Sequence, residues 1–495
     1  MSETPLELID AIRSCESEPL HLSGAIQSFG ALLVVAGDGC ISHASENLAA
    51  LTGTAAASVL GQPLSCCPWL PPAAFDALGE QTGDSLALLI HLADGSEGQV
   101  RGIRSHDGMV VEIEANPSLG EAVATNQWQR ILLSVPADED AMAVHHRTLV
   151  NAFHRITGFD RVMLYRFRED WAGEVIAEEA FGPLGSYLGL RFPASDIPAI
   201  ARNLYLLNPS RLIPEVVAAP VGILSQGLPP PDLTWSELRS VSPVHLEYLR
   251  NMGVGASFSV PVRIAGQLWG LVACHHLTPR QLSPVQRQLC SNLTNAYALG
   301  VTSYIASRRL QMIDSLDRRT DRLLEALAQH DDPLDGIEAN GAQFMEMLDA
   351  SGFAMAVGDQ VVIAGDGPDL EGMARVDHWF VNACPDYVSA TNHLESLFPG
   401  NMLLLASASG LLAIKARSPR SGWVRFYWFR PQEPEEVQWA GNPNKPMVEN
   451  SGAAMLSPRR SFERWVETKT GYSRPWSNEE KMTAAKFRNM LLRWL

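Results

Sequence analysis

The stretch Ser242-Pro-Val-His-Leu-Glu-Tyr248 combines a helix start with polar side chains suited to facing a ligand. Proline is accepted in the first helical turn because its missing N–H would have no helical partner there. His245 and Tyr248 are three residues apart, so a helix places them on one face. Further along, residues 268–276 form an apolar run that ends in Cys274-His-His276, which predicts a strand with histidines at its end.

The overall composition excludes several classes of protein. The chain has 495 residues, a formal net charge of −17 and 7 cysteines. Its length predicts about three domains of roughly 150 residues each. The charge, with no Lys/Arg-rich run, argues against a nucleic-acid partner. The sequence has no secretory signal and no apolar run long enough to span a membrane, and its scattered cysteines fit a reducing compartment. We therefore expect a cytoplasmic protein.

Periodicity predicts α+β domains along the chain. Within residues 1–125 we expect strands at 31–35, from Ile41, at 86–92 and at 109–113, and a short helix capped by Ser45. Residues 126–305 are expected to hold a helix near 141–157 and strands at 161–168, 174–179, 257–263 and 268–275. The connection 209–238 is rich in proline and glycine and too long for an ordinary loop, which favours a functional role.

Residues 293–330 predict one long helix. Apolar positions alternate steps of three and four along it, at Ile313, Leu316, Thr320, Leu323 and Leu327. This spacing fits either packing on the helix's own domain or a seam with a second chain. A third α+β domain follows, and Ser477 with Glu480 forms a capping box for a last helix. That helix runs to the end of the sequence, so we expect an output domain beyond it.

Several polar residues are candidates for a binding site, each with a simpler alternative. Cys15 is either incidental or an accessible nucleophile that anchors a ligand. Asp196 either caps a helix or offers its carbonyl to a ligand. Arg211 and Arg239 flank the long connection. They are either ordinary surface residues or, if they converge, a clamp for a carboxylate.

Enzyme and metal sites are less favoured. Cys274, His275 and His276 are consecutive, but neighbours on a strand point to opposite faces, and no second ligand pair has zinc spacing. No catalytic triad, phosphate loop or dinucleotide fingerprint is apparent. Near the C-terminus, residues 423–430 predict a strand. Phe462, Trp465 and Val466 follow helical spacing, although the natural partner of their segment is a strand. This conflict fits either a segment with two conformations or an ordinary hairpin.

Taken in order, four segments resemble the bacterial phytochromes, which are red/far-red photoreceptors that bind biliverdin. They are Pro193-Ala-Ser-Asp-Ile-Pro198, the stretch from Ser242 to Gly253, residues 268–276 and Pro458-Arg-Arg-Ser-Phe462. The resemblance covers the whole chain. It implies an α+β fold of three domains, each an antiparallel sheet with flanking helices: PAS (1–125), GAF (126–305) and PHY (306–495). It also implies a long connecting helix and a tongue at about 421–476. The segment around Ile26 would thread a lasso within 214–242 as a figure-of-eight knot.

The resemblance implies a role for each site residue. Cys15 would carry biliverdin as a thioether, Asp196 would accept from its pyrrole N–H groups, and His245 would hold a water beside them. Arg211 and Arg239 would bind one propionate. The other expected cofactor-binding residues are Ser257 and Ser259 at the second propionate, His275 at the ring D carbonyl, and Tyr165, Phe192, Ile197, Tyr205, Ser242 and Tyr248 around the pigment.

The tongue and two local sequence features complete these expectations. Arg459 would reach from the tongue to Asp196, with Ser461 as its alternative. Relatives in plants and cyanobacteria carry the anchoring cysteine where this chain has Val244, so the anchor is expected to be N-terminal and the pigment to be biliverdin. The family usually has Gln-Pro-His-Gly where this chain has Gln27-Ser-Phe-Gly30, which leaves the knot and the edge of the pocket open.

The resemblance implies a red/far-red photoreceptor in which light isomerises biliverdin at ring D. The tongue and the long helices would then switch and control a C-terminal output domain. The alternative is a GAF-type sensor of a small diffusible ligand. No phosphoacceptor or ATP-binding segment is apparent, so this chain is not expected to be an enzyme, although the full-length protein could be a sensor histidine kinase. Expected partners are a second copy, as a parallel or antiparallel homodimer through GAF and PHY helices, and a downstream output or response-regulator protein.

Overall fold

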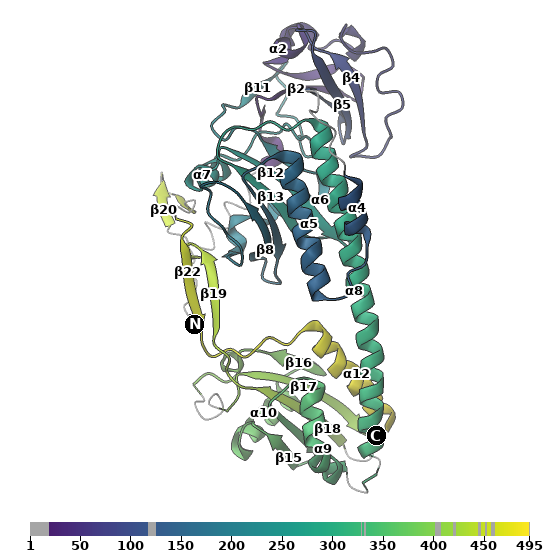
Figure 1. The fold of residues 1–495 in the computed structure, drawn as a ribbon, viewed down its shortest axis with the longest axis vertical. Coiled ribbons are helices and arrows are strands. Elements are labelled where there is room, and N and C mark those ends of the chain that lie inside the picture. Colours follow the sequence, from purple (N-terminus) through teal and green to yellow (C-terminus); the bar gives the residue numbers. More distant parts are fainter. Residues whose placement is uncertain are drawn as a thin grey trace. The chain divides into compact units, whose positions relative to one another are not determined.

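The computed structural model describes residues 19–116, 125–327, 329–330, 333–400, 407–418, 422–443, 447–450, 453–456 and 461–494 (Figure 1). Cys15 and Arg459, which the sequence analysis singled out, lie outside these residues. The chain divides into two compact units, residues 1–304 with 438–465 and residues 305–437 with 466–495. No helix within the described part of the chain is long and apolar enough to cross a membrane.

The N-terminal sheet has the strand order β1-β11-β3-β2-β6-β5-β4 and is antiparallel throughout. Its elements are η1 (Leu20–Leu22), β1 (Ala25–Ile26), β2 (Gly30–Ala36), β3 (Ile41–Ser45), α2 (Leu48–Thr52), α3 (Ala56–Val59), η2 (Leu64–Cys66), β4 (Ser85–His91), β5 (Glu97–Ser105), β6 (Gly108–Ala115) and β11 (Val221–Ser225). The expected strands are present, and β5 is one that the sequence analysis missed. The expected cap is wrong. Ser45 belongs to β3 and accepts a hydrogen bond from the backbone N–H of Leu32 at 2.9 Å, while Asn47 precedes α2.

The segment around Ile26 lies between two parts of the long connection. β1 pairs with Gly222 and Val221 of β11 on one side. On the other side Ile26 forms a bridge with Arg239, and the N–H of Ser240 donates to the carbonyl of Ala25. A chain that passes through a loop makes contacts of this kind, so the arrangement is consistent with the expected knot.

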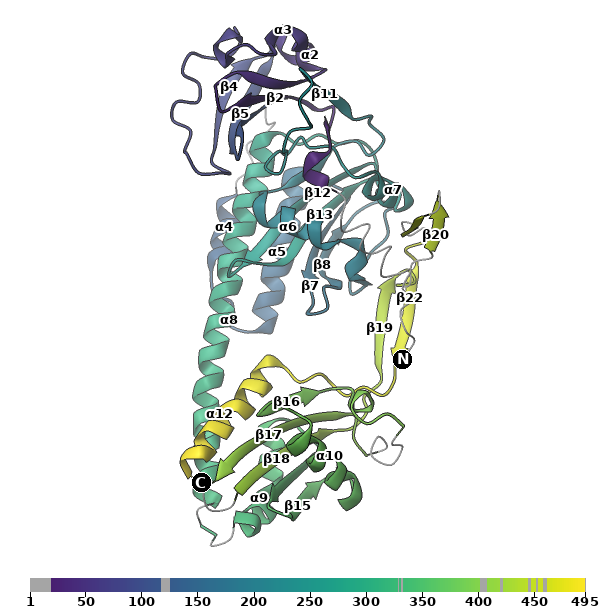
Figure 2. The same cartoon turned by 180° about the vertical axis from the view of Figure 1, so that it is seen from behind.

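The middle sheet has the order β10-β12-β13-β7-β8-β9-β19-β22. Its strands are β7 (Arg161–Phe167), β8 (Gly173–Ala180), β9 (Arg191–Phe192), β10 (Arg211–Ile213), β12 (Ala256–Ile264), β13 (Gln267–His276), β19 (Glu435–Ala440) and β22 (Arg464–Lys469), and the associated helices are α4 (Asn126–Leu133), α5 (Glu139–Thr157), η3 (Ala194–Asp196), α6 (Ala199–Leu207), α7 (Pro243–Asn251) and α8 (Pro284–Leu327). Asp138 caps α5, and Gly158 ends it with a φ of 64°. Helices α4 and α5 and the first part of α8 cover one face of this sheet (Figure 2) and share its apolar core.

The C-terminal sheet has the order β15-β14-β18-β17-β16. Its elements are α9 (Pro333–Met347), β14 (Gly352–Val357), β15 (Gln360–Gly365), α10 (Leu370–Asn382), β16 (Val388–Thr391), η4 (Leu394–Ser396), β17 (Gly410–Ser418), β18 (Gly422–Arg430) and α12 (Asn478–Trp494). The predicted capping box is confirmed, since Ser477 and Glu480 exchange backbone-to-side-chain hydrogen bonds of 2.8 and 3.1 Å. Leu323 of the heptad pattern packs in this unit's own core with Phe344 and Trp428, so at this position the helix packs within its domain.

The extension that leaves this sheet starts later than the expected tongue. β18 is the central strand of the C-terminal sheet, so its residues belong to the domain core. Beyond Arg430 come β19, β20 (Met447–Asn450), β21 (Ala453–Leu456) and β22. Trp465 and Val466, which follow helical spacing in the sequence, lie in strand β22. Trp439 of β19 pairs with Arg191 of β9 in parallel, and Gly441 donates its N–H to the carbonyl of Glu463.

Candidate functional site

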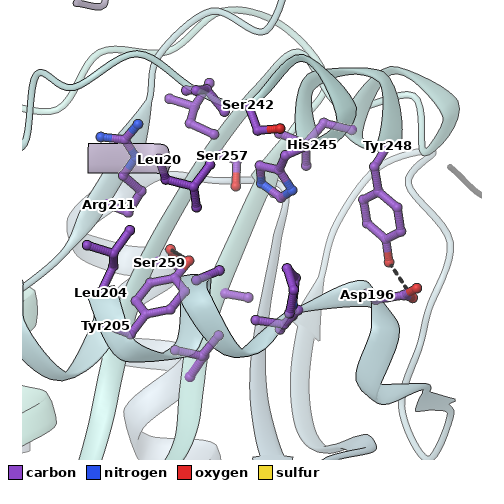
Figure 3. A pocket seen from close by; sticks show the side chains of 18 of the residues that line it. Leu20, Asp196, Leu204, Tyr205, Arg211, Ser242, His245, Tyr248, Ser257 and Ser259 are labelled. Carbon is purple, nitrogen blue, oxygen red and sulfur yellow. Dashed lines mark hydrogen bonds between the residues drawn. The ribbon is translucent and has the colours of Figure 1, made fainter. Parts of the chain in front are cut away.

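A cavity of about 270 Å³ lies on the face of the middle sheet opposite α5 (Figure 3). Helices α6 and α7, the 3₁₀ helix η3 and the connection around residues 236–242 surround it. Of the expected site residues that the structure describes, all except Ser461 line it: Tyr165, Phe192, Asp196, Ile197, Tyr205, Arg211, Arg239, Ser242, His245, Tyr248, Ser257, Ser259 and His275. Ser461 is exposed, and its hydroxyl accepts from the N–H of Glu463.

Strand alternation explains which side chains reach this cavity. Successive residues of a strand point to opposite faces of the sheet. Ser257, Ser259 and His275 therefore face the cavity, whereas Phe258 and Cys274 enter the core shared with α5 and α8. The same alternation places His275 on the face opposite Cys274 and His276, and Nδ1 of His276 lies 2.7 Å from Oδ2 of Asp160.

Tyr165 lies over a glycine of the neighbouring strand. A Cβ added to Gly173 would be 1.5 Å from Cζ of Tyr165, so a larger residue there would displace the ring. The ring lies near Phe192, at 5.9 Å between centroids, and near Phe167, at 5.3 Å. The three side chains belong to one apolar cluster, of which Tyr165 and Phe192 line the cavity.

Two arginines converge on the cavity from opposite ends of the long connection. Arg211 donates to the carbonyl oxygens of Glu237, Arg239 and Ser240 at 3.0, 2.5 and 3.0 Å. Arg239 donates to those of Leu233 and Thr234 at 3.3 Å. Burial lowers the pKa of Arg211 to about 10 and that of Arg239 to about 9, where the charge of Arg211 adds to the effect. Backbone carbonyl oxygens hold both guanidinium cations. Because these cations are enclosed, the negative charge of an anionic ligand would stabilise them.

A polar group connects η3 with α7. The hydroxyl of Tyr248 donates to Oδ2 of Asp196 at 3.1 Å (Figure 3), and the rings of Tyr248 and His245 are stacked at 6.1 Å. Asp196 does not cap α6, because Pro198 holds that position without a side-chain bond. The ring of His245 is exposed toward the cavity, yet its enclosed position, with Arg211 nearby, lowers its pKa to about 4. Phe462 contacts Tyr248 edge-on at 5.1 Å.

His275 has a partner that the sequence analysis missed. Nη2 of Arg161 lies 2.9 Å from Nδ1 of His275, and Arg161 is 1% exposed. Burial and then the charge of Arg161 hold the pKa of His275 well below its usual value. A signal was present in the sequence: Arg161 opens the otherwise apolar run of residues 161–165, where a surface position is not expected.

The departure at residues 27–30 lies away from the cavity. Within the described chain, none of these four residues is part of the cavity lining. Gln27 donates its side-chain amide to the carbonyl of Leu212 at 3.0 Å, and Phe29 packs against the cores of both the middle sheet and the N-terminal segment. Of the two substituted residues, Phe29 therefore contributes to packing between the N-terminal segment and the sheet, whereas Ser28 is exposed.

Comparisons with known proteins agree with this architecture. Three family models match in order: "PAS fold" at residues 15–116, "GAF domain" at 146–301 and "Phytochrome region" at 316–495. A bacteriophytochrome of Pseudomonas aeruginosa is 33% identical over 98% of this chain, and one of Xanthomonas campestris is 31% identical over 94%. The chain spans 66% of the first relative's length and 75% of the second's.

A solved structure gives the same result in three dimensions. The crystal structure of a bacteriophytochrome from the photosynthetic bacterium R. palustris matches with a TM-score of 0.84 at 31% identity. The match covers 97% of this chain and 98% of that one. With the three domain matches in order and all of the cavity lining except Leu20 inside the GAF match, the chain belongs to the bacterial phytochrome family and contains its PAS, GAF and PHY photosensory domains.

Proposed function

We propose that this chain senses red and far-red light through biliverdin, joined to Cys15 by a thioether and held in the GAF cavity. One observation carries the proposal: residues from six segments of the sequence that were each assigned to a bilin line a single cavity. When bound, the bilin absorbs the light and isomerises about a methine bridge. The protein's own residues hold it, orient it and respond to the change.

The polar groups of the cavity fit a bilin. Biliverdin carries two propionates, and Arg211 and Arg239 provide two cations whose pKa values are lowered by burial. Ser257 and Ser259 offer hydroxyls from the floor of the cavity, with Ser259 hydrogen-bonded to Tyr205 at 2.7 Å. The remaining wall is largely apolar, as a flat conjugated ligand requires.

Cys15 is close along the chain to a residue that lines this cavity. Leu20 lines the cavity, and the carbonyl of His21 accepts from the N–H of Leu233, which fixes this segment in place. Cys15 precedes Leu20 by five residues, which an extended chain covers within about 17 Å. The reach supports Cys15 as the anchor, and Val244 leaves no thiol at the alternative position.

The residues around Asp196 provide the means of switching. Asp196 accepts from Tyr248, and we propose that it exchanges this contact for others, including Arg459 of the tongue, when the ligand changes shape. Phe462 already contacts Tyr248, so the extension follows any movement of this ring. A ligand shifts such an equilibrium only by binding the two protein forms unequally.

Biliverdin binding separates this proposal from a sensor of a diffusible ligand. Purified chain is mixed with biliverdin, denatured, and examined for pigment that migrates with the protein. A coloured adduct that is lost in Cys15→Ala but kept in Cys66→Ala, a variant of an exposed cysteine, supports the proposal. The absence of colour in the wild type would favour the diffusible-ligand sensor.

The activity of the complete protein is also a proposal, since the chain spans 66% of the Pseudomonas relative. We propose a cytoplasmic protein whose signal passes through α8 and α12 to an output domain, such as a histidine kinase acting on a response regulator. We further propose a homodimer through the GAF helices, because Leu133, Val135, Val144 and Leu299 are exposed by 45%, 52%, 44% and 57%. Light scattering checks this: Leu299→Arg should be monomeric, and Leu89→Arg, on β4, should stay dimeric.

A further inference from the structure

Arg161 is held firmly next to the cavity. Its Nη1 donates to the carbonyl oxygens of Leu184 and Gly185 at 2.8 and 3.1 Å. Its guanidinium lies over the ring of Tyr187, 4.0 Å from the centroid. With 1% of its surface exposed, the side chain has little freedom, so the position of its second terminal nitrogen, Nη2, is determined by these contacts.

Arg161 and His275 lie next to one another on two neighbouring strands. They are directly opposed in the antiparallel pairing of β7 with β13, and Nη2 lies 2.9 Å from Nδ1. A guanidinium carries hydrogens on all its nitrogens and cannot accept a hydrogen bond. Nδ1 of His275 must therefore be the acceptor, which means that it bears no hydrogen.

The protonation state of His275 follows from its surroundings. Burial and the charge of Arg161 keep its pKa well below the usual value, with a further contribution from His245. The imidazole is therefore neutral and has a single hydrogen. Because Nδ1 is an acceptor, that hydrogen is on Nε2.

We propose that Arg161 is a positioning residue that locks His275 in the Nε2–H tautomer and thereby makes it a permanent hydrogen-bond donor to the ligand in the GAF cavity. An unconstrained histidine presents either a donor or an acceptor at Nε2. With Arg161 in place the cavity selects a ligand oxygen acceptor, such as a ring carbonyl, over an N–H donor at this point. The cation also polarises the imidazole, which strengthens the Nε2–H donor.

The identity of the acceptor rests on the proposed function, in which a bilin would offer a carbonyl to His275. The tautomer of His275 does not depend on the proposed function. Nitrogen NMR of the full chain without pigment, labelled with ¹⁵N in histidine, therefore tests the tautomer separately. His275→Gln identifies the signals by their loss. The wild type should show an unprotonated Nδ1 and a protonated Nε2. A hydrogen on Nδ1 of His275 in the wild type would overturn the proposal even if no Arg161 variant folds.

Substitution of Arg161 tests its role. Arg161→Met should leave His275 with hydrogen distributed over both nitrogens, whereas Arg161→Lys, which keeps a cationic donor, should restore the single tautomer. Arg166→Met is the matched control, since Arg166 lies on the same strand, is half exposed and pairs with Glu174. Thermal melting identifies variants that are merely unfolded. A single Nε2–H tautomer in folded Arg161→Met would contradict the proposal.

The holoprotein provides a second readout. Glutamine at position 275 offers an amide donor near the place of Nε2 and needs no tautomer, so Arg161→Met should shift the red absorption maximum less than half as far in the His275→Gln background as in the wild type. Equal shifts in both backgrounds would mean that Arg161 acts independently of His275. A wild type that forms no coloured adduct would refute the proposed function and leave the tautomer to be decided by NMR.

Discussion

The hydroxyl of Tyr248 on α7 donates to Oδ2 of Asp196 at the end of η3, at 3.1 Å. This bond joins the two motifs that the sequence places more than forty residues apart. Phe462 packs edge-on against the same tyrosine. The motif Pro458-Arg-Arg-Ser-Phe462 therefore contacts the Tyr248–Asp196 pair through the ring of Phe462, independently of Arg459.

Tyr248→Phe should keep the pigment attached and slow the return from the lit to the resting form. We assign the Tyr248–Asp196 bond to the resting form. The loss of one such hydrogen bond costs about 1 kcal/mol, or roughly fivefold in an equilibrium. Absorbance after a red pulse, followed in darkness, measures the return. Tyr297→Phe, which removes a hydroxyl bonded to His146, is the control, and an unchanged rate in Tyr248→Phe would contradict the role given to this bond.

Arg459→Ala should leave adduct formation intact but weaken the formation or persistence of the lit state. Arg459 lies outside the described residues, so this prediction rests on the family resemblance. Difference spectra between dark and illuminated samples measure it, with the neighbouring Arg460→Ala as the control. If Arg459→Ala photocycled like the wild type, the proposed contact with Asp196 would be wrong.

Arg239→Gln should weaken the non-covalent binding of biliverdin. In a Cys15→Ala background, where only non-covalent binding operates, the loss of a hydrogen bond to a charged group costs about 1.5–3 kcal/mol, or roughly 10- to 150-fold in the dissociation constant. Titration followed by absorbance measures it. Arg250→Gln, on the exposed side of α7, should bind normally; equal losses in both variants would show a general charge effect instead.

Arg287→Met should destabilise the chain strongly. Arg287 is 5% exposed and lies 2.6 Å from both Glu114 and Glu237, so its removal leaves two buried carboxylates without this partner. Breaking a buried ion pair on one side costs about 3–5 kcal/mol. Urea denaturation measures the free energy of unfolding. Arg375→Met, which breaks the exposed pair with Glu371, should cost less than about 1 kcal/mol, and a similar small cost for Arg287→Met would refute the prediction.

His146 should make the apoprotein less stable in acid. Burial, then the charges of Arg166 and His145, lower its pKa to about 4. The unfolded chain therefore binds more protons than the folded one between pH 6.5 and about 4, so stability is full above this window and falls as the pH drops through it. His146→Gln should remove on the order of 2 kcal/mol of this loss. Unfolding at pH 7 and pH 4.5 measures it, with exposed His91→Gln as the control. An unchanged pH dependence would be inconsistent with a neutral buried His146.

Local sequence determined most of the secondary structure. Apolar patterning predicted β7, β8, β12 and β13 of the middle sheet, because side chains of a strand have a period of two. The capping box at Ser477 predicted the start of α12, because both of its bonds are local. Of the residues that the family resemblance assigned to the pigment or the tongue, all except Ser461 and the two outside the described residues, Cys15 and Arg459, line one cavity, and their roles are proposals.

Tertiary structure decided what depends on partners distant in the chain. Ser45 has the composition of a cap, but its hydroxyl is used by Leu32 of the adjacent strand. The sequence shows Arg161 as a charged residue in an apolar run; only the pairing of β7 with β13 places it beside His275. The helical spacing near Trp465 is overridden by pairing within the extension. For Ser45 and Arg161, burial leaves the polar group no partner other than the one that the tertiary structure supplies. For the exposed residues around Trp465, strand pairing outweighs the local preference.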